Sequence, residues 1–168
     1  MREYLLFALM GKEANAAYEF TDALQGSMPE LTVKRTRSPG ILVAWVSAQV
    51  DVEDRLRKDL WRFYSLKKVA RVGFSISLDS DQSSWDKLSE QLNLSIGDNL
   101  YRITLHRVSR EEERKRIIAK VTSKIRAKPS LKHFSVEVIC YLVDSTLYVV
   151  DSAVGEISLD KLRFNPSS

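Results

Sequence analysis

The first half of the chain alternates short apolar runs with amphipathic segments. Residues 4–10 form a compact apolar run that is too short for most helices and is predicted to be a buried strand. Residues 13–25 place apolar side chains on one helical face and are followed by Gly26, which suits the left-handed end of a helix. We therefore expect a strand and then a helix at the start of the chain.

Two further strands and a second helix follow. Residues 31–37 and 41–46 are rich in β-forming side chains and flank a Ser-Pro-Gly turn, which predicts a hairpin. Asp51 can cap an amphipathic helix, and residues 69–78 alternate as a fourth strand. The order β-α-β-β-α-β is that of a ferredoxin-like domain, which we predict for residues 1–78.

A polar stretch without apolar residues, 79–84, marks the predicted start of a second domain that covers residues 79–168. Ser84 can cap a short helix there. Residues 136–143 and 146–150 flank an Asp-Ser turn and predict a closing hairpin. The predicted fold class is α/β (α+β), a ferredoxin-like domain followed by a small α/β domain.

Positive charge is concentrated in one stretch of the second domain. Residues 101–132 contain 11 Lys and Arg against three acidic residues, whereas the whole chain carries 26 basic and 22 acidic residues. Lys and Arg hold phosphates and release counterions when they do so. A basic block beside a mildly acidic remainder therefore predicts a surface that binds a polyanion.

The centre of this stretch is a predicted basic helix. Ser109 and Glu112 have the spacing of a capping box, and the helix is expected to extend for about 18 residues, or about 27 Å. Cations repeat along one side, away from an apolar stripe. With the preceding strand and the following loop, the candidate phosphate-binding residues are Arg102, His106, Arg107, Arg110, Arg114, Arg116, Lys120, Lys124, Lys128 and Lys132.

A row of cations can also serve only solubility, and this interpretation stays open. Like charges at helical spacing repel one another, and few acidic residues relieve them here, so solubility alone explains the row poorly. A smaller cluster, Lys34, Arg35 and Arg37, is a secondary candidate for RNA binding. Ordinary decoration of the first hairpin explains that cluster equally well.

Evidence for other chemistry is sparse. The sequence has no Gly-rich nucleotide loop, no nucleophile motif and no paired metal-ligand motif. Cys140 is predicted to be a core residue, as are Trp45, Trp61 and Trp85, whereas His133 is either inert or stacks on a base. We therefore expect no catalytic residues, no cofactor and no metal. The single cysteine and the lack of a bilayer-length apolar run lead us to expect a cytoplasmic protein that does not enter a membrane.

The chain resembles the THUMP-containing RNA-modification proteins, which join an N-terminal ferredoxin-like domain to a THUMP domain. The resemblance covers nearly the whole chain and rests on soft motifs: YLLFALMGKEANAAYEF, VKRTRSPGILVAWV, GDNLYRITLHRVSREEERKRIIAKVTSKI and VEVICYLVDSTLYVV. The residues that fit the family pattern in the third motif are Gly97, Tyr101, Arg102, His106, Arg107 and Ser109. Most similar is the branch that has no catalytic domain and assists the tRNA cytidine acetyltransferase.

The resemblance implies a non-catalytic adaptor that binds the acceptor region of tRNA, and not DNA. It implies that the tRNA is presented to a separate tRNA cytidine N4-acetyltransferase. Two alternatives remain open. The chain is the RNA-binding subunit or a fragment of a THUMP-linked methyltransferase or thiolation enzyme, or it is a protein-interaction scaffold whose basic helix meets an acidic partner.

Overall fold

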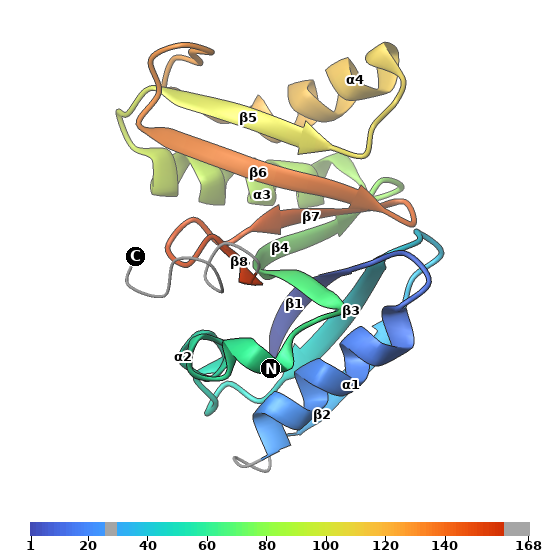
Figure 1. Cartoon of the computed structure of the whole chain (residues 1–168). Coiled ribbons are helices and arrows are strands. Elements are labelled where there is room, and N and C mark those ends of the chain that lie inside the picture. The colour runs from blue at the N-terminus through green and yellow to red at the C-terminus, as the bar shows by residue number, and fades with distance from the viewer. Residues whose placement is uncertain (26–29, 160–168) are drawn as a thin grey trace. The chain divides into compact units, whose positions relative to one another are not determined.

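The chain forms two compact units in a computed structural model that describes residues 1–25 and 30–159 (Figure 1). The first unit consists of Met1–Val72 and the segment that starts at Ala153, and the second unit is Gly73–Ser152. Each unit has its own cluster of buried apolar side chains. The predicted mixed α/β fold class is confirmed.

The first unit has the predicted β-α-β-β-α-β order, followed by one short strand from the end of the chain. Its strands follow the order β2-β3-β1-β4, all neighbours are antiparallel, and β8 pairs with β4. The elements are β1 (Arg2–Ala8), α1 (Glu13–Leu24), β2 (Leu31–Arg35), β3 (Ile41–Val46), α2 (Val52–Lys58), the 3-10 helix η2 (Leu60–Arg62), β4 (Leu66–Ser77) and β8 (Glu156–Ser158).

The core of the first unit lies between this sheet and its helices. Tyr4 and Leu6 of β1 pack with Phe20 of α1, and all three side chains are almost fully buried. Burying one such apolar side chain stabilises a fold by about 1.5–3 kcal/mol. Ile157 and Leu159 belong to the same cluster, so apolar burial helps hold the segment after Ala153 against this unit.

Because of this segment, the compact units differ from the predicted ranges 1–78 and 79–168. The prediction assigned the whole C-terminal part to the second domain, whereas the segment from Ala153 groups with the first unit. The physical reason is that β8 pairs with β4 over the register Lys68 to Ser158, Val69 to Ile157 and Ala70 to Glu156. Gly26, which also entered the predictions, lies outside the described residues, as does the side chain of Trp61.

A glutamate of α1 anchors the chain before β4. The Glu19 carboxylate accepts hydrogen bonds from the backbone N–H groups of Tyr64, Ser65 and Leu66, at 2.9–3.2 Å. Hydrogen bonds to an ionised acceptor are stronger than neutral ones. Three successive N–H groups on one carboxylate therefore fix the turn that leads into β4.

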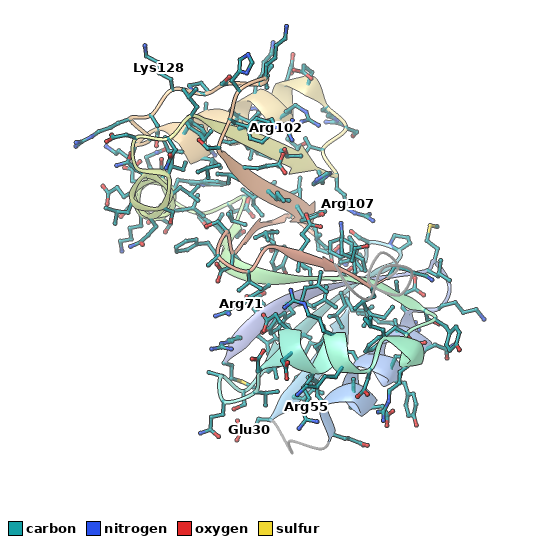
Figure 2. The ribbon with its side chains drawn as sticks, turned by 60° about the vertical axis from the view of Figure 1, so that its left-hand side comes forward. Glu30, Arg55, Arg71, Arg102, Arg107 and Lys128 are labelled. Atoms are coloured by element: carbon teal, nitrogen blue, oxygen red, sulfur yellow. The ribbon has the colours of Figure 1, made fainter. Side chains whose placement is uncertain are left out.

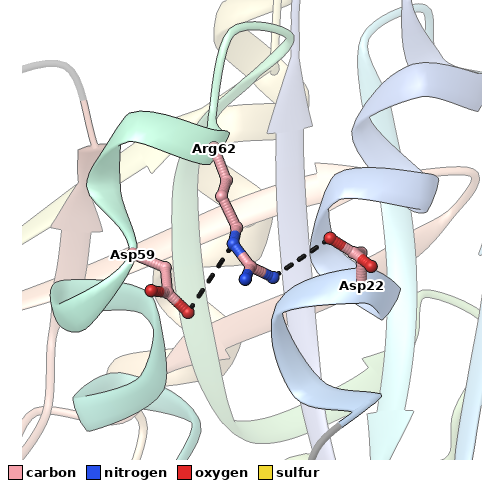
Figure 3. Close-up of polar contacts among 3 residues, drawn as sticks. All are labelled: Asp22, Asp59 and Arg62. Atoms are coloured by element: carbon pink, nitrogen blue, oxygen red, sulfur yellow. Dashed lines mark hydrogen bonds and ion pairs between the residues drawn. The ribbon is translucent and has the colours of Figure 1, made fainter.

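A second polar cluster joins the two helices of the first unit. Arg62 Nη1 donates a hydrogen bond to Asp22 Oδ2 at 3.1 Å, and Arg62 Nε lies 3.8 Å from Asp59 Oδ2 (Figure 3). Asp22 lies on α1 and Asp59 ends α2, so one guanidinium connects both helices. The charge of Arg62 is thereby balanced by acidic side chains of the same unit.

The second unit covers one face of a four-stranded sheet with two helices (Figure 1). The strand order is β4-β7-β6-β5, with β5 and β6 parallel and β6 and β7 antiparallel. This unit contains the part of β4 from Gly73 onward. Its other elements are α3 (Gln82–Ile96), β5 (Tyr101–His106), α4 (Glu111–Thr122), β6 (Val136–Val143) and β7 (Thr146–Val150).

The turns and caps of the chain agree with the predictions in part. Asp144 and Ser145 both have positive φ, 50° and 64°, as the tight turn of the predicted β6-β7 hairpin requires. Asp51 caps α2, as predicted. The predicted cap of α3 is wrong, because Asp81 Oδ1 accepts from the backbone N–H of Ser84 at 2.9 Å and the helix begins one turn earlier than expected.

Candidate nucleic-acid interface

The basic helix is shorter than predicted and starts differently. α4 spans 12 residues rather than about 18, and its N-cap is Arg110, which makes no side-chain capping bond. The predicted capping box of Ser109 and Glu112 is therefore wrong. Arg107 adopts a left-handed conformation with φ of 67° directly after β5, which turns the chain before the helix begins. Two further residues then separate that turn from the cap, so Ser109 precedes the capping position.

The face of β5 opposite the helices carries the first candidate, Arg102. Its Nη2 donates to Glu137 Oε2 on β6, and its guanidinium carbon lies 4.1 Å from the centre of the Phe134 ring. Thr104 Oγ1 donates to the same Glu137 oxygen at 3.0 Å. The hydrogen bond from Arg102 lowers the pKa of Glu137 against the opposing effect of burial. The charge of Arg102 is thus largely balanced within the molecule.

His106 lies on the same face of the sheet, two strand positions beyond Thr104. Its ring stacks on that of Tyr141, with centroids 4.7 Å apart and planes 18° from parallel. The histidine is exposed whereas the tyrosine is buried. One side of the imidazole is therefore supported by an aromatic ring, while the residue as a whole remains exposed.

The candidates on α4 lie on the sides of the helix that its buried residues leave free. Ile117 and Val121 face the core of the unit. Arg116 is exposed, whereas Arg114 and Lys120 are half-buried. Lys120 Nζ lies 5.2 Å from the centre of the Trp85 ring on α3, a geometry typical of a cation–π contact.

The end of α4 is held by two polar side chains of α3. Ser89 Oγ accepts from the backbone N–H of Lys124 at 2.8 Å, and Asn93 Oδ1 accepts from that of Arg126 at 3.0 Å. Ser89 is fully buried. Lys124 thus follows the helix instead of continuing its basic row, and its position is set by a hydrogen bond that sequence spacing did not reveal.

The basic loop after α4 is tied to the start of β5. The backbone N–H of Tyr101 donates to the carbonyl of Lys128 at 3.4 Å, and the N–H of Ser130 donates to the carbonyl of Tyr101 at 2.8 Å. Pro129 thereby forms a parallel bridge with Tyr101. The side chains of Lys128 and Lys132 are exposed, and Figure 2 shows Lys128 extending away from the fold. The lysines of this loop therefore extend from a backbone that is hydrogen-bonded to β5.

We call residues 107–132 the basic segment. Within the described part of the chain, none of its lysines or arginines forms an ion pair with an acidic side chain, whereas other cations do. The paired cations include Lys58 with Asp54, and Lys68 with Glu156. The three glutamates of the segment occupy the first turn of α4, where the helix dipole stabilises them. The charge of the segment is therefore not neutralised by the fold.

The secondary candidates lie in the first unit, on and after β2. Lys34 and Arg35 are exposed on the strand, and Lys34 Nζ lies 5.7 Å from the centre of the half-buried Trp45 ring. Arg37 is exposed in the turn that follows. The structure thus places the two basic clusters in different compact units.

The one cysteine of the chain lies in the core of the second unit. Burial raises the pKa of the Cys140 thiol to about 12, which keeps it protonated. Across residues 1–25 and 30–159, no three His, Cys, Asp or Glu side chains cluster as metal ligands would. Over the same ranges, no helix has the length and hydropathy to span a bilayer.

Sequence reasoning missed three residues that shape the interface: Ser89, Asn93 and Glu137. Each acts over more than 30 positions along the chain. Ser89 and Asn93 could have been found, because two polar residues four positions apart on the inward side of a helix indicate polar contacts with a neighbouring element. Glu137 had no such signal, because its pairing with Arg102 depends on the parallel register of β5 and β6.

Three solved structures share the fold of this chain. PH1313 from Pyrococcus horikoshii Ot3 matches with a TM-score of 0.60 at 13% identity, over 94% of this chain and 55% of that one. A 4-thiouridine synthetase in complex with RNA and bound ATP matches with a TM-score of 0.58 at 14% identity, over 94% of this chain and 42% of that one. TrmN from Thermus thermophilus matches with a TM-score of 0.52 at 12% identity, over 93% of this chain and 46% of that one.

These likenesses concern the fold and not the sequence. No protein-family model matches the chain, and no curated protein matches it. The chain spans about half the length of the three solved proteins. The match nevertheless extends over both compact units. The chain thus has the fold of THUMP-domain proteins, as its motifs implied.

Proposed function

We propose that the chain binds tRNA through the basic segment and presents it to a separate modification enzyme, without catalysing a reaction itself. The observation that carries this proposal is the lack of ion pairs along the segment, within the described residues, in a chain that has 22 acidic residues. Unpaired cations repel one another. They gain most from a partner that supplies negative charge, and a phosphate backbone does so.

The fold supports RNA as that partner. One of the three solved structures reported above is a complex of a 4-thiouridine synthetase with RNA. In an A-form helix the major groove is too narrow for side chains, so proteins recognise folded RNA by its shape, backbone and unpaired ends. A short helix and a bonded loop that present several cations suit contacts of this kind.

Binding to three nucleic acids tests the proposal. We expect the purified chain to bind tRNA more tightly than a duplex RNA or a duplex DNA of equal length. Replacing Lys128 and Lys132 with Glu should weaken tRNA binding by roughly tenfold or more, because removing an ion pair with a phosphate lowers the affinity. The same change at Lys12 and Arg57, two exposed cations of the first unit outside both basic clusters, is the control. Equal, weak binding to all three ligands would contradict the proposal.

The enzyme that we propose as the recipient is a tRNA cytidine N4-acetyltransferase, on the basis of the motif resemblance. Mass spectrometry of tRNA nucleosides from cells that lack the chain tests this step. Loss of N4-acetylcytidine, restored by the wild-type chain but not by the Lys128→Glu, Lys132→Glu variant, is the expected result. An unchanged level of N4-acetylcytidine would overturn the choice of enzyme.

A second candidate follows from length. Because the chain spans about half of each of the three solved proteins, it can instead be the RNA-binding part of a methyltransferase or thiolation enzyme. Affinity purification distinguishes the two candidates. A stoichiometric methyltransferase or sulfur-transfer protein would favour the second, and an acetyltransferase the first.

A further inference from the structure

A cavity of about 230 Å³ in the second unit lies between Trp85, near the start of α3, and the side of α4 that carries Glu113, Ile117 and Lys120. Its apolar part comes from Leu78, Ile117 and the indole ring of Trp85, and its charged part from three side chains of α4. These charged residues are Glu113, Arg116 and Lys120. An apolar floor with a few convergent charges is the usual form of a small ligand site.

Trp85 provides an independent sign of a ligand. Its side chain is 1% exposed, and its Nε1–H has no acceptor among the described residues. A buried donor without a partner costs about 1–3 kcal/mol, and buried polar groups in native structures are nearly always satisfied. Trp85 lines the cavity, so a ligand oxygen that binds there and displaces the atoms covering Nε1 would supply the missing acceptor.

The charges of the cavity select the ligand. Lys120 is held over the indole ring, with Nζ 5.2 Å from its centre, and Arg116 lies one helical turn earlier. Glu113 and Arg116 form no ion pair with each other or with other described residues. Two cations and one carboxylate leave a single excess positive charge. That balance matches a phosphodiester, which carries one negative charge, better than a phosphate monoester, which carries ~1.5–2.

We propose that this cavity binds one backbone phosphate of the RNA. Lys120 and Arg116 form ion pairs with its oxygens, and Trp85 Nε1 donates a hydrogen bond. The identity of the ligand rests on the proposed function, because RNA is the source of the phosphodiester. Glu113 excludes ligands that carry more negative charge. The cavity thus adds a fixed contact point to the otherwise flexible lysines of the basic segment.

The indole N–H signal of Trp85 in a ¹H–¹⁵N spectrum tests the site directly. The probe is a dinucleotide with one 3′–5′ phosphodiester and no terminal phosphate, and the control is the same two nucleosides unlinked. We expect the dinucleotide to shift the signal and the nucleosides to leave it unchanged. No shift, or the same shift with the nucleosides, would overturn the proposal. Inorganic phosphate that displaces the dinucleotide at lower concentration would also overturn it, in favour of a free anion.

Two variants with opposite expected effects extend the test to tRNA. Trp85→Phe keeps an aromatic ring, smaller than the indole, but removes the N–H donor, and should weaken tRNA binding by about tenfold, since a hydrogen bond to a charged group contributes at least that much. Glu113→Gln should strengthen binding more than Glu112→Gln, which removes the same charge from the same turn outside the cavity. Melting curves confirm that each variant is folded.

Failure of this site and failure of the proposed function give different results. If Trp85→Phe binds tRNA like the wild type while Lys128→Glu, Lys132→Glu does not, the cavity is not a phosphate site and the adaptor proposal stands. If the wild type binds no tRNA, the adaptor proposal fails, and the dinucleotide titration alone decides the cavity.

Discussion

At the scale of single residues, the structure separates cations that stabilise the fold from cations that are left for a partner. Arg102 belongs to the first group, because it donates to Glu137 and stacks on Phe134. Lys128 belongs to the second, being exposed and without an acidic partner among the described residues. Both were predicted as phosphate ligands from charge alone. Sequence spacing could place them near each other but could not show which one was already paired.

The pair of Arg102 and Glu137 predicts a pH dependence of stability. The pKa of Glu137 is lowered in the folded chain, chiefly by the hydrogen bond from Arg102. A lowered pKa contributes stability that is present above the unfolded pKa, near 4.5, and is lost as the pH falls through the folded value. Glu137→Gln should therefore be less stable than the wild type at pH 7, by roughly 1 kcal/mol, with the difference vanishing in acid.

Denaturant unfolding across pH checks this expectation. Glu111→Gln, which changes an exposed carboxylate in the first turn of α4, is the matched control. A difference between Glu137→Gln and the wild type that stays constant from pH 7 to pH 3 would show that the ion pair has no part in it.

At the scale of elements, periodicity predicted most helices and strands, whereas their ends depend on interactions from elsewhere. α4 was expected to continue past Lys124, but the helix ends before it. Ser89 and Asn93 of α3 accept hydrogen bonds from the backbone N–H groups of Lys124 and Arg126 beyond that end. β8 was missed because a three-residue strand carries almost no pattern and forms only by pairing with β4. Long-range hydrogen bonds of this kind leave no local trace in the sequence.

Glu19 provides a prediction at this scale, since one side chain fixes the join between α1 and β4. Glu19→Ala leaves three backbone N–H groups without their acceptor. The expected loss of stability is roughly 2–4 kcal/mol, or a fall in Tm of about 5–15 °C. Thermal unfolding followed by circular dichroism measures it. Asn15→Ala, on an exposed position of the same helix, is the control, and equal Tm values for the two variants would refute the role of Glu19.

At the scale of the whole molecule, the α/β class, the β-α-β-β-α-β order and the closing hairpin were all predictable from hydrophobic patterns. The sequence also located the basic segment, because charge clustering needs no knowledge of the fold. The cavity beside Trp85 was not predictable, since its walls come together from α3, α4 and the residue that follows β4. The chain thus combines a fold shared with three solved proteins and a cationic segment that its own acidic residues, as far as the structure describes them, leave unpaired.

The salt dependence of tRNA binding tests the central claim most directly. If about five phosphates are neutralised, a plot of log K against log salt should have a slope of roughly −3.5 to −4.5. Changing Arg116, Lys124 and Lys128 to Gln should reduce that slope by about 2–3. The same change at Lys12, Arg57 and Lys58, exposed in the first unit and outside both basic clusters, should leave it unaltered. A slope near zero for the wild type, or an equal reduction in both variants, would contradict RNA binding through the basic segment.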